Sequence, residues 1–141
     1  MKAPQLLLEN THPTLGVDEE VLARLVAYVL QAEQCTWHYV GVILSDHATV
    51  LELNRTYLGH NYLTDVLSFA LHIAGEAVEG EVYVDLDTAY ERHEEFNTSF
   101  DDEVRRYAIH GLLHLIGYDD ATPEEKAAMR IREDRYLLAV S

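Results

Sequence analysis

Residues 108–120 read Ala-Ile-His-Gly-Leu-Leu-His-Leu-Ile-Gly-Tyr-Asp-Asp and contain the most apolar helical stretch of the chain. His110 and His114 lie four residues apart, so on a helix both imidazoles project from one face and can reach one ion. Gly117 ends the helix and lets the following Tyr-Asp-Asp turn a carboxylate back toward the histidines. The spacing predicts a metal site with three protein ligands and a fourth position open to water, as in catalytic zinc sites.

The same histidines also have a simpler explanation. With eight histidines in 141 residues, one pair at this spacing can arise without any function. The apolar surroundings favour the metal site, because an imidazole without a partner is costly to bury. Gly111 stands where zinc proteases of the His-Glu-x-x-His type carry their general base, which disfavours that class of enzyme.

Outward from this stretch, hydrophobic periodicity and capping residues predict short elements that follow one another closely. The expected strands are 5–9, 37–44, 65–71 and 81–85, and the expected helices are 18–31, 46–59, 87–96, 99–116 and 122–140. Most strands come early and most helices come late. This order predicts an α+β fold, with a small, mostly mixed four-stranded sheet packed against about four to five helices.

The totals indicate one globular domain over residues 1–141. Hydrophobic residues make up 48% of the chain and charged residues 25%, which excludes a disordered or low-complexity protein. No apolar run approaches the roughly 20 residues that cross a bilayer, so we expect no membrane contact. A single cysteine, Cys35, and the lack of a signal-like apolar segment at the N-terminus predict a cytoplasmic location.

Several motifs resemble the YbeY family of metal-dependent endoribonucleases. Residues 110–120 resemble its motif His-Gly-x-Leu-His-Leu-x-Gly-Tyr-Asp-His. The segments Leu53-Asn-Arg-Thr-Tyr57 and Leu63-Thr-Asp-Val-Leu-Ser-Phe69 are similar to its Leu-Asn-x-x-Tyr-Arg and Pro-Thr-Asp-Val-Leu-Ser-Phe. Gly80-Glu-Val-Tyr-Val84 and Met129-Arg-x-x-Glu133 resemble its Gly-Asp-Ile-x-Ile strand and the Met-x-x-x-Glu of its last helix. The likeness extends from about residue 50 to the C-terminus.

The resemblance implies a single α+β domain with a metal ion in a cleft between the helices and the sheet. It implies a hydrolase that cuts single-stranded RNA, in which water bound to the metal attacks the phosphodiester. The implied role is 3′-end maturation of 16S rRNA and ribosome quality control. The implied partners are rRNA within the small ribosomal subunit and ribosomal or assembly proteins, and DNA is not among them.

By position, His110 and His114 correspond to metal ligands of the family. Asp120 stands where the family usually has a third histidine, and Asp119 is the rival third ligand. The expected cofactor is one Zn²⁺ per chain. A carboxylate cancels one charge of the ion, so we expect bound water to be acidified less and Mn²⁺ or Ni²⁺ to compete better.

Other positions of the motifs suggest contacts with substrate or with the metal ligands. Asn54, Asp65 and Ser68 are candidates for this role, with packing or backbone hydrogen bonding as the alternative. Leu58 stands where the family usually has an arginine suited to holding phosphate. Arg55, Arg105, Arg106 and the nearby His60 are possible substitutes, although a surface role is the simpler explanation for each.

The net charge argues against tight RNA binding. The chain carries 25 acidic and ten basic residues, a net charge of −15, and such a protein repels polyanions at long range. Two alternatives to a ribonuclease therefore stay open. One is a non-catalytic ribosome-assembly factor with a structural metal, and the other is a metallohydrolase that acts on another substrate.

Overall fold

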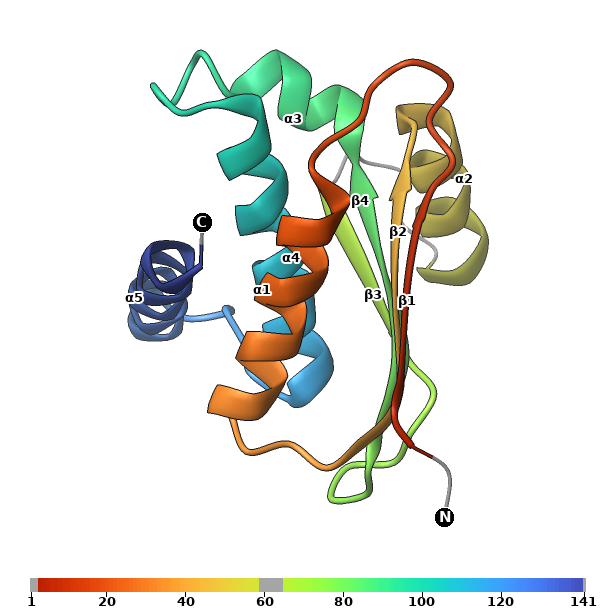
Figure 1. Ribbon diagram of the computed structural model, residues 1–141, viewed down its shortest axis with the longest axis vertical. Coiled ribbons are helices and arrows are strands. Elements are labelled where there is room, and N and C mark those ends of the chain that lie inside the picture. The colour runs from red at the N-terminus through yellow and green to blue at the C-terminus, as the bar shows by residue number, and fades with distance from the viewer. Residues whose placement is uncertain (1–2, 59–64, 141) are drawn as a thin grey trace.

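Four strands form one mixed sheet in the order β1-β2-β4-β3 (Figure 1). The computed structural model describes residues 3–58 and 65–140. The strands are β1 (Gln5–Asn10), β2 (Trp37–Ser45), β3 (Val66–Ala70) and β4 (Val78–Asp85). β1, β2 and β4 run parallel, and β3 pairs antiparallel with β4 at the edge. The predicted α+β fold with a mixed four-stranded sheet is confirmed.

Five helices surround the sheet in the described part of the chain. They are α1 (Glu19–Ala32), α2 (His47–Leu58), α3 (Leu86–Arg92), α4 (Phe100–Ile116) and α5 (Pro123–Ala139). Figure 1 shows α1 and α4 on one face, α2 on the other, and α5 outside α1 and α4. Asp18, Ser99 and Thr122 cap α1, α4 and α5, each by accepting a hydrogen bond from a backbone amide of the first turn.

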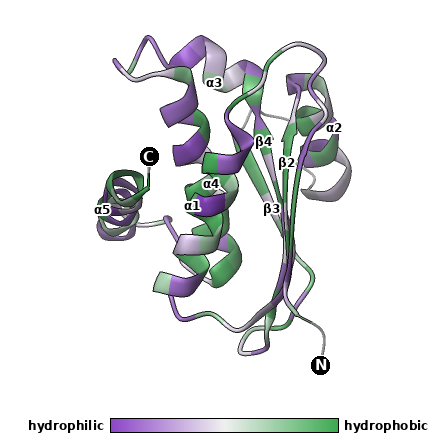
Figure 2. Cartoon of the chain, in the orientation of Figure 1, coloured by the Kyte–Doolittle hydropathy of each residue, from purple (hydrophilic) through white to green (hydrophobic). Residues whose placement is uncertain are grey.

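The hydrophobic core lies between the sheet and the helices α1 and α4, where Figure 2 shows mainly apolar residues. Glycines let α4 approach the sheet closely. A Cβ on Gly111 of α4 would lie 2.5 Å from a Val82 methyl, and a Cβ on Gly80 of β4 would lie 2.4 Å from a Leu115 methyl. Larger residues at either position would push the helix away, so these glycines set the height of α4 above the sheet.

The bounds differ from the sequence expectation by more than one residue at two elements. The helix expected over 87–96 ends at Arg92, because Asn97 adopts a left-handed conformation and the Thr98 amide donates back to the His93 carbonyl. The strand expected from residue 81 begins at Val78, since pairing with β2 extends it. The expected end of α2 at Gly59 lies outside the described residues. Within the described ranges, the helices are too short or too polar to span a membrane.

Candidate metal centre

Three side-chain atoms converge at the C-terminal end of α4. The Nε2 atoms of His110 and His114 lie 3.1 Å apart, and the Oδ2 atom of Asp120 lies 3.2 Å from the first and 3.4 Å from the second. Tetrahedral zinc with bonds of about 2.0–2.1 Å places neighbouring donor atoms roughly 3.3 Å apart. The separation and the donor chemistry therefore both fit a single divalent cation.

Each imidazole is oriented through its other nitrogen. The Nδ1 atom of His114 donates to the Tyr118 carbonyl at 3.0 Å, and the Nδ1 atom of His110 donates to the Glu133 carboxylate at 2.7 Å. Because these oxygens accept, the proton belongs on Nδ1 in both rings. Both Nε2 lone pairs then face Asp120, in the arrangement that orients histidine ligands of metal sites.

The carboxylates around the site favour positive charge there. Burial by itself would lower the pKa of His110, but the hydrogen bond and charge of Glu133 and the charge of Asp120 raise it above its usual value. Glu133 is only 4% exposed, and its second oxygen accepts from Arg106 at 3.0 Å. The negative charges of Glu133 and Asp120 thus favour a positive charge at this position.

The turn after α4 determines which aspartate joins the site. Gly117 has a φ of 124°, which lets the chain leave the helix sharply. The Tyr118 hydroxyl donates to Glu33 at 2.6 Å and ties the turn to the end of α1. This places Asp120 beside the histidines, whereas Asp119 is exposed and lies outside the cluster.

A cleft of about 840 Å³ begins at His110 and Asp120 and continues along α4 toward its N-terminal half. It lies mainly between α4 and α5, and Asp65, next to β3, brings the sheet edge into its wall. Four of the ten basic and six of the 25 acidic residues line it, a net charge of −2. These charged residues are Arg92, Arg106, Lys126, Arg130, Asp65, Asp102, Glu103, Asp120, Glu133 and Asp134.

The three candidate contact residues lie in different places. Asp65 lines the cleft. The Ser68 hydroxyl donates to the Gly111 carbonyl at 2.7 Å and so ties β3 to the helix that carries both histidines. Asn54 is buried in α2, at 1% exposure, and does not line the cleft.

The possible substitutes for the family arginine also lie in different parts of the molecule. Arg55 pairs with Glu52 on α2, and Arg105 pairs with Asp102 on α4. Arg106 lines the cleft, one turn before His110. The structure describes Leu58 only as the last residue of α2, and His60 lies outside the described residues.

Glu133 contacts the site in a way that the motifs of the sequence do not predict. In the sequence it appears only as part of a family motif, whereas in the structure it holds His110. A signal was present, because Met129, Glu133 and Tyr136 follow helical spacing and form the buried stripe of α5. A charged residue within such an apolar stripe indicates a buried partner.

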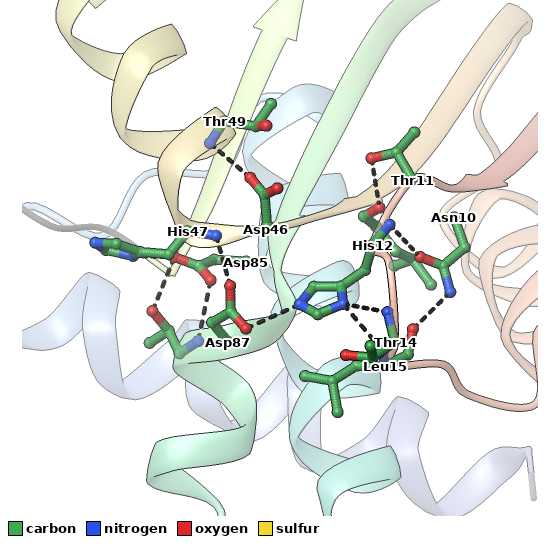
Figure 3. Close-up of polar contacts among 12 residues, drawn as sticks. Asn10, Thr11, His12, Thr14, Leu15, Asp46, His47, Thr49, Asp85 and Asp87 are labelled. Atoms are coloured by element: carbon green, nitrogen blue, oxygen red, sulfur yellow. Dashed lines mark hydrogen bonds and ion pairs between the residues drawn. The ribbon is translucent and has the colours of Figure 1, made fainter.

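A second histidine–carboxylate cluster lies at the opposite, carboxyl end of the parallel strands (Figure 3). His12 Nε2 donates to Asp87 at 2.8 Å, and His47 Nδ1 donates to Asp85 at 2.7 Å. The His47 amide also donates to Asp87, and Thr88 donates twice to Asp85. We call these four residues, His12, His47, Asp85 and Asp87, the strand-end cluster.

Comparisons with known proteins agree with this architecture. A family model described as Endoribonuclease YbeY matches residues 8–141. Endoribonuclease YbeY of Salinibacter ruber is 50% identical, over 96% of this chain and 91% of that protein. The protein of that name from Chlorobaculum tepidum is 40% identical, over 86% of this chain and 88% of that protein. A solution structure of a Thermotoga maritima protein superposes with a TM-score of 0.63 at 28% identity, covering 94% of this chain and 87% of that one.

Proposed function

The chain belongs to the YbeY endoribonuclease family, and we propose that it is a metal-dependent endoribonuclease of single-stranded RNA acting in 3′-end maturation of 16S rRNA. The observation that carries the proposal is the convergence of two imidazole nitrogens and one carboxylate oxygen within 3.4 Å. Each of these three atoms can offer an electron pair, so one cation can satisfy all of them together.

In this proposal His110, His114 and Asp120 hold one divalent cation, with Zn²⁺ expected and Mn²⁺ or Ni²⁺ as competitors. Such an ion supplies an acidified water molecule and polarises the phosphoryl oxygens of its substrate. Glu133 and the Tyr118 carbonyl keep the imidazoles in the orientation that binds. Arg92, Lys126 and Arg130 in the cleft supply positive charge for the phosphates, whereas Arg106 is paired with Glu133 and Asp134.

Side-chain exposure favours a catalytic site over a structural metal pin. The side chains of His110, His114 and Asp120 are 26%, 29% and 34% exposed. Structural zinc sites are closed by a fourth protein ligand, whereas catalytic sites keep a position for water or substrate. Within the described residues, the cluster offers three ligands and opens into the cleft.

The charge distribution reconciles an acidic protein with an RNA substrate. The cleft lining has four basic residues against six acidic ones, and one divalent cation cancels its net charge of −2. The remaining surface stays strongly acidic, so we expect weak binding of free RNA at physiological salt. We infer that the small ribosomal subunit and its proteins present the substrate. Nanomolar binding of naked RNA in a filter-binding salt series would contradict this inference.

Elemental analysis and a cleavage assay test the proposal together. We expect about one metal ion per chain and cleavage of a short single-stranded RNA that chelator abolishes. His114→Ala should lose both the metal and the cleavage while circular dichroism shows an intact fold. A protein that binds one metal but cuts no RNA would instead support an assembly factor or a hydrolase of another substrate.

Replacing the proposed carboxylate ligand tests which cation the site prefers. Asp120→His replaces a charged ligand with a neutral one, so we expect zinc to gain on manganese in competition titrations. The acidic limb of the pH–rate profile should move to lower pH in the variant. An unchanged or upward-shifted limb would show that Asp120 does not set the acidity at this site.

A further inference from the structure

Glu103 is a buried carboxyl group in the wall of the cleft that the proposed mechanism does not use. It is 4% exposed, and its Oε2 atom has no hydrogen-bond partner among the described residues. A buried acceptor without a donor is costly, and native proteins seldom keep one without a reason. Desolvation raises the pKa of this group above its usual value, against the lowering effect of Arg106.

The position of Glu103 relates it to the metal centre. It lies seven residues before His110 on α4, two helical turns or about 10.5 Å along the axis, and on the same face of the helix. This distance is too long for Glu103 to exchange a proton at an atom held by His110. The distance suits a contact between Glu103 and a neighbouring nucleotide of a bound RNA, because the same cleft continues from His110 to Glu103.

Nearby arginines do not satisfy Glu103. Arg106 donates to Glu133 and Asp134, at 3.0 and 2.6 Å. Arg92 lies over the Phe96 ring, and Arg130 pairs with Asp134 at 4.0 Å. The cleft therefore presents cations suited to phosphate beside a carboxylate suited to hydrogen-bond donors. A nucleotide offers both, since its phosphate is anionic and most bases carry an amino group.

We propose that Glu103 is a specificity-determining residue, whose carboxylate accepts a hydrogen bond from the amino group of a base next to the scissile bond. This inference rests on the proposed ribonuclease function. Guanine, adenine and cytosine carry an exocyclic amino group, whereas the only base donor of uracil is the ring N3–H, which lies between two carbonyl oxygens that a carboxylate repels. Guanosine, adenosine and cytidine are favoured over uridine at this position.

Two measurements on the metal-loaded protein test the assignment. The first is NMR titration with the four nucleoside 5′-monophosphates. The second is cleavage of an all-uridine oligonucleotide compared with oligonucleotides that carry one A, C or G beside the cut. We expect UMP to bind at least about fivefold more weakly than the other three, the lower end of what one good base-edge contact supplies. The cleavage rates should follow the same order.

Glu103→Gln is the informative variant, because the amide has the same shape and offers both a donor and an acceptor. We expect the preference against uridine to shrink to about twofold or less in the variant. Glu94→Gln is the matched control, since it removes the same charge from an exposed side chain outside the cleft and should keep the preference.

Two results would overturn the assignment. They are equal cutting of the four oligonucleotides and a preference against uridine that survives Glu103→Gln. A failure to cut any RNA is a different result, because it overturns the proposed function. In that case a base preference in the titrations that depends on Glu103 would still support base recognition in the cleft.

Discussion

The strand-end cluster and the metal centre are each built from two histidines and aspartate, yet they are opposite in their hydrogen bonding. At the strand ends every carboxylate oxygen accepts, and Asp85 alone receives hydrogen bonds from His47 and twice from Thr88. At the metal centre three acceptor atoms face one another. Residue type alone therefore does not distinguish a cation site from a structural network.

The position on the helices explains the difference. The strand-end cluster lies where α2 and α3 begin, and the first turns of helices carry free backbone amides that donate to Asp85 and Asp87. The metal centre lies where α4 ends, a region of free backbone carbonyls, and just past the C-cap the Tyr118 carbonyl accepts from His114. Backbone donors compensate the carboxylates in one region, whereas in the other a bound cation would take that role.

The largest expected effect is a stabilisation by zinc that depends on the metal centre and not on the strand-end cluster. Zinc at about 1,000 times its dissociation constant should raise the free energy of unfolding by ~4 kcal/mol. His114→Ala should abolish this stabilisation, and His47→Ala should keep it, because only the metal centre presents converging acceptors. Urea denaturation with and without zinc measures both. Equal loss in the two variants would contradict the distinction between the clusters.

The next effect concerns the network that needs no metal. Asp85→Ala removes a fully buried carboxylate and leaves the donors of His47 and Thr88 unpaired, which should cost about 3 kcal/mol of unfolding free energy. Zinc stoichiometry should not change. Asp46→Ala, which removes the cap of α2 at the amide and hydroxyl of Thr49, is the control and should cost about 1 kcal/mol. Equal costs would argue against the network as a unit.

A third change weakens the metal centre without touching a ligand. Glu133→Gln keeps the shape of the side chain but removes the charge that faces His110, so metal affinity should fall by roughly 10- to 100-fold. Asp134→Asn is the matched control, because Asp134 shares Arg106 with Glu133 and does not contact His110. Calorimetric titration with metal compares the two variants. A similar loss of metal affinity in both would mean that the effect acts through Arg106.

The smallest effect is the pH dependence of stability. Burial acts to raise the pKa of Asp87, but hydrogen bonds from the His47 amide and from His12 outweigh it and hold the pKa below its usual value. Asp87 therefore contributes stability above its unfolded-state pKa, and this is lost as pH falls through its folded-state pKa. Asp87→Asn should flatten the acid side of the stability profile, measured by urea denaturation at several pH values.

Glu103 provides the control for Asp87, because its pKa is shifted in the opposite direction. Because its folded-state pKa is raised, its ionised form destabilises the fold above that pKa, and the penalty disappears as pH falls below the unfolded-state pKa. Glu103→Gln should therefore stabilise the protein at neutral pH and have no effect in acid. A loss of stability at neutral pH would mean that the carboxylate has a partner in the folded protein.

Local patterns in the sequence were enough to predict where helices occur and that His110 and His114 lie together. The caps at Asp18, Ser99 and Thr122 act within one turn of their own helices, so they can be identified without tertiary structure. The spacing of His110 and His114 places their rings together on any helix, and in the structure their Nε2 atoms lie 3.1 Å apart. The mixed sheet could be expected as a class, although its strand order could not.

Tertiary structure decided everything that joins distant segments. The choice of Asp120 over Asp119 depends on how Glu33, 85 residues before Tyr118, ties down the turn. The contact of Glu133 with His110, and the burial of Glu103 beside the cleft, depend on how α5 packs on α4. Helical spacing is a property of neighbouring residues, whereas these contacts require chain segments to be folded against one another, which no local pattern encodes.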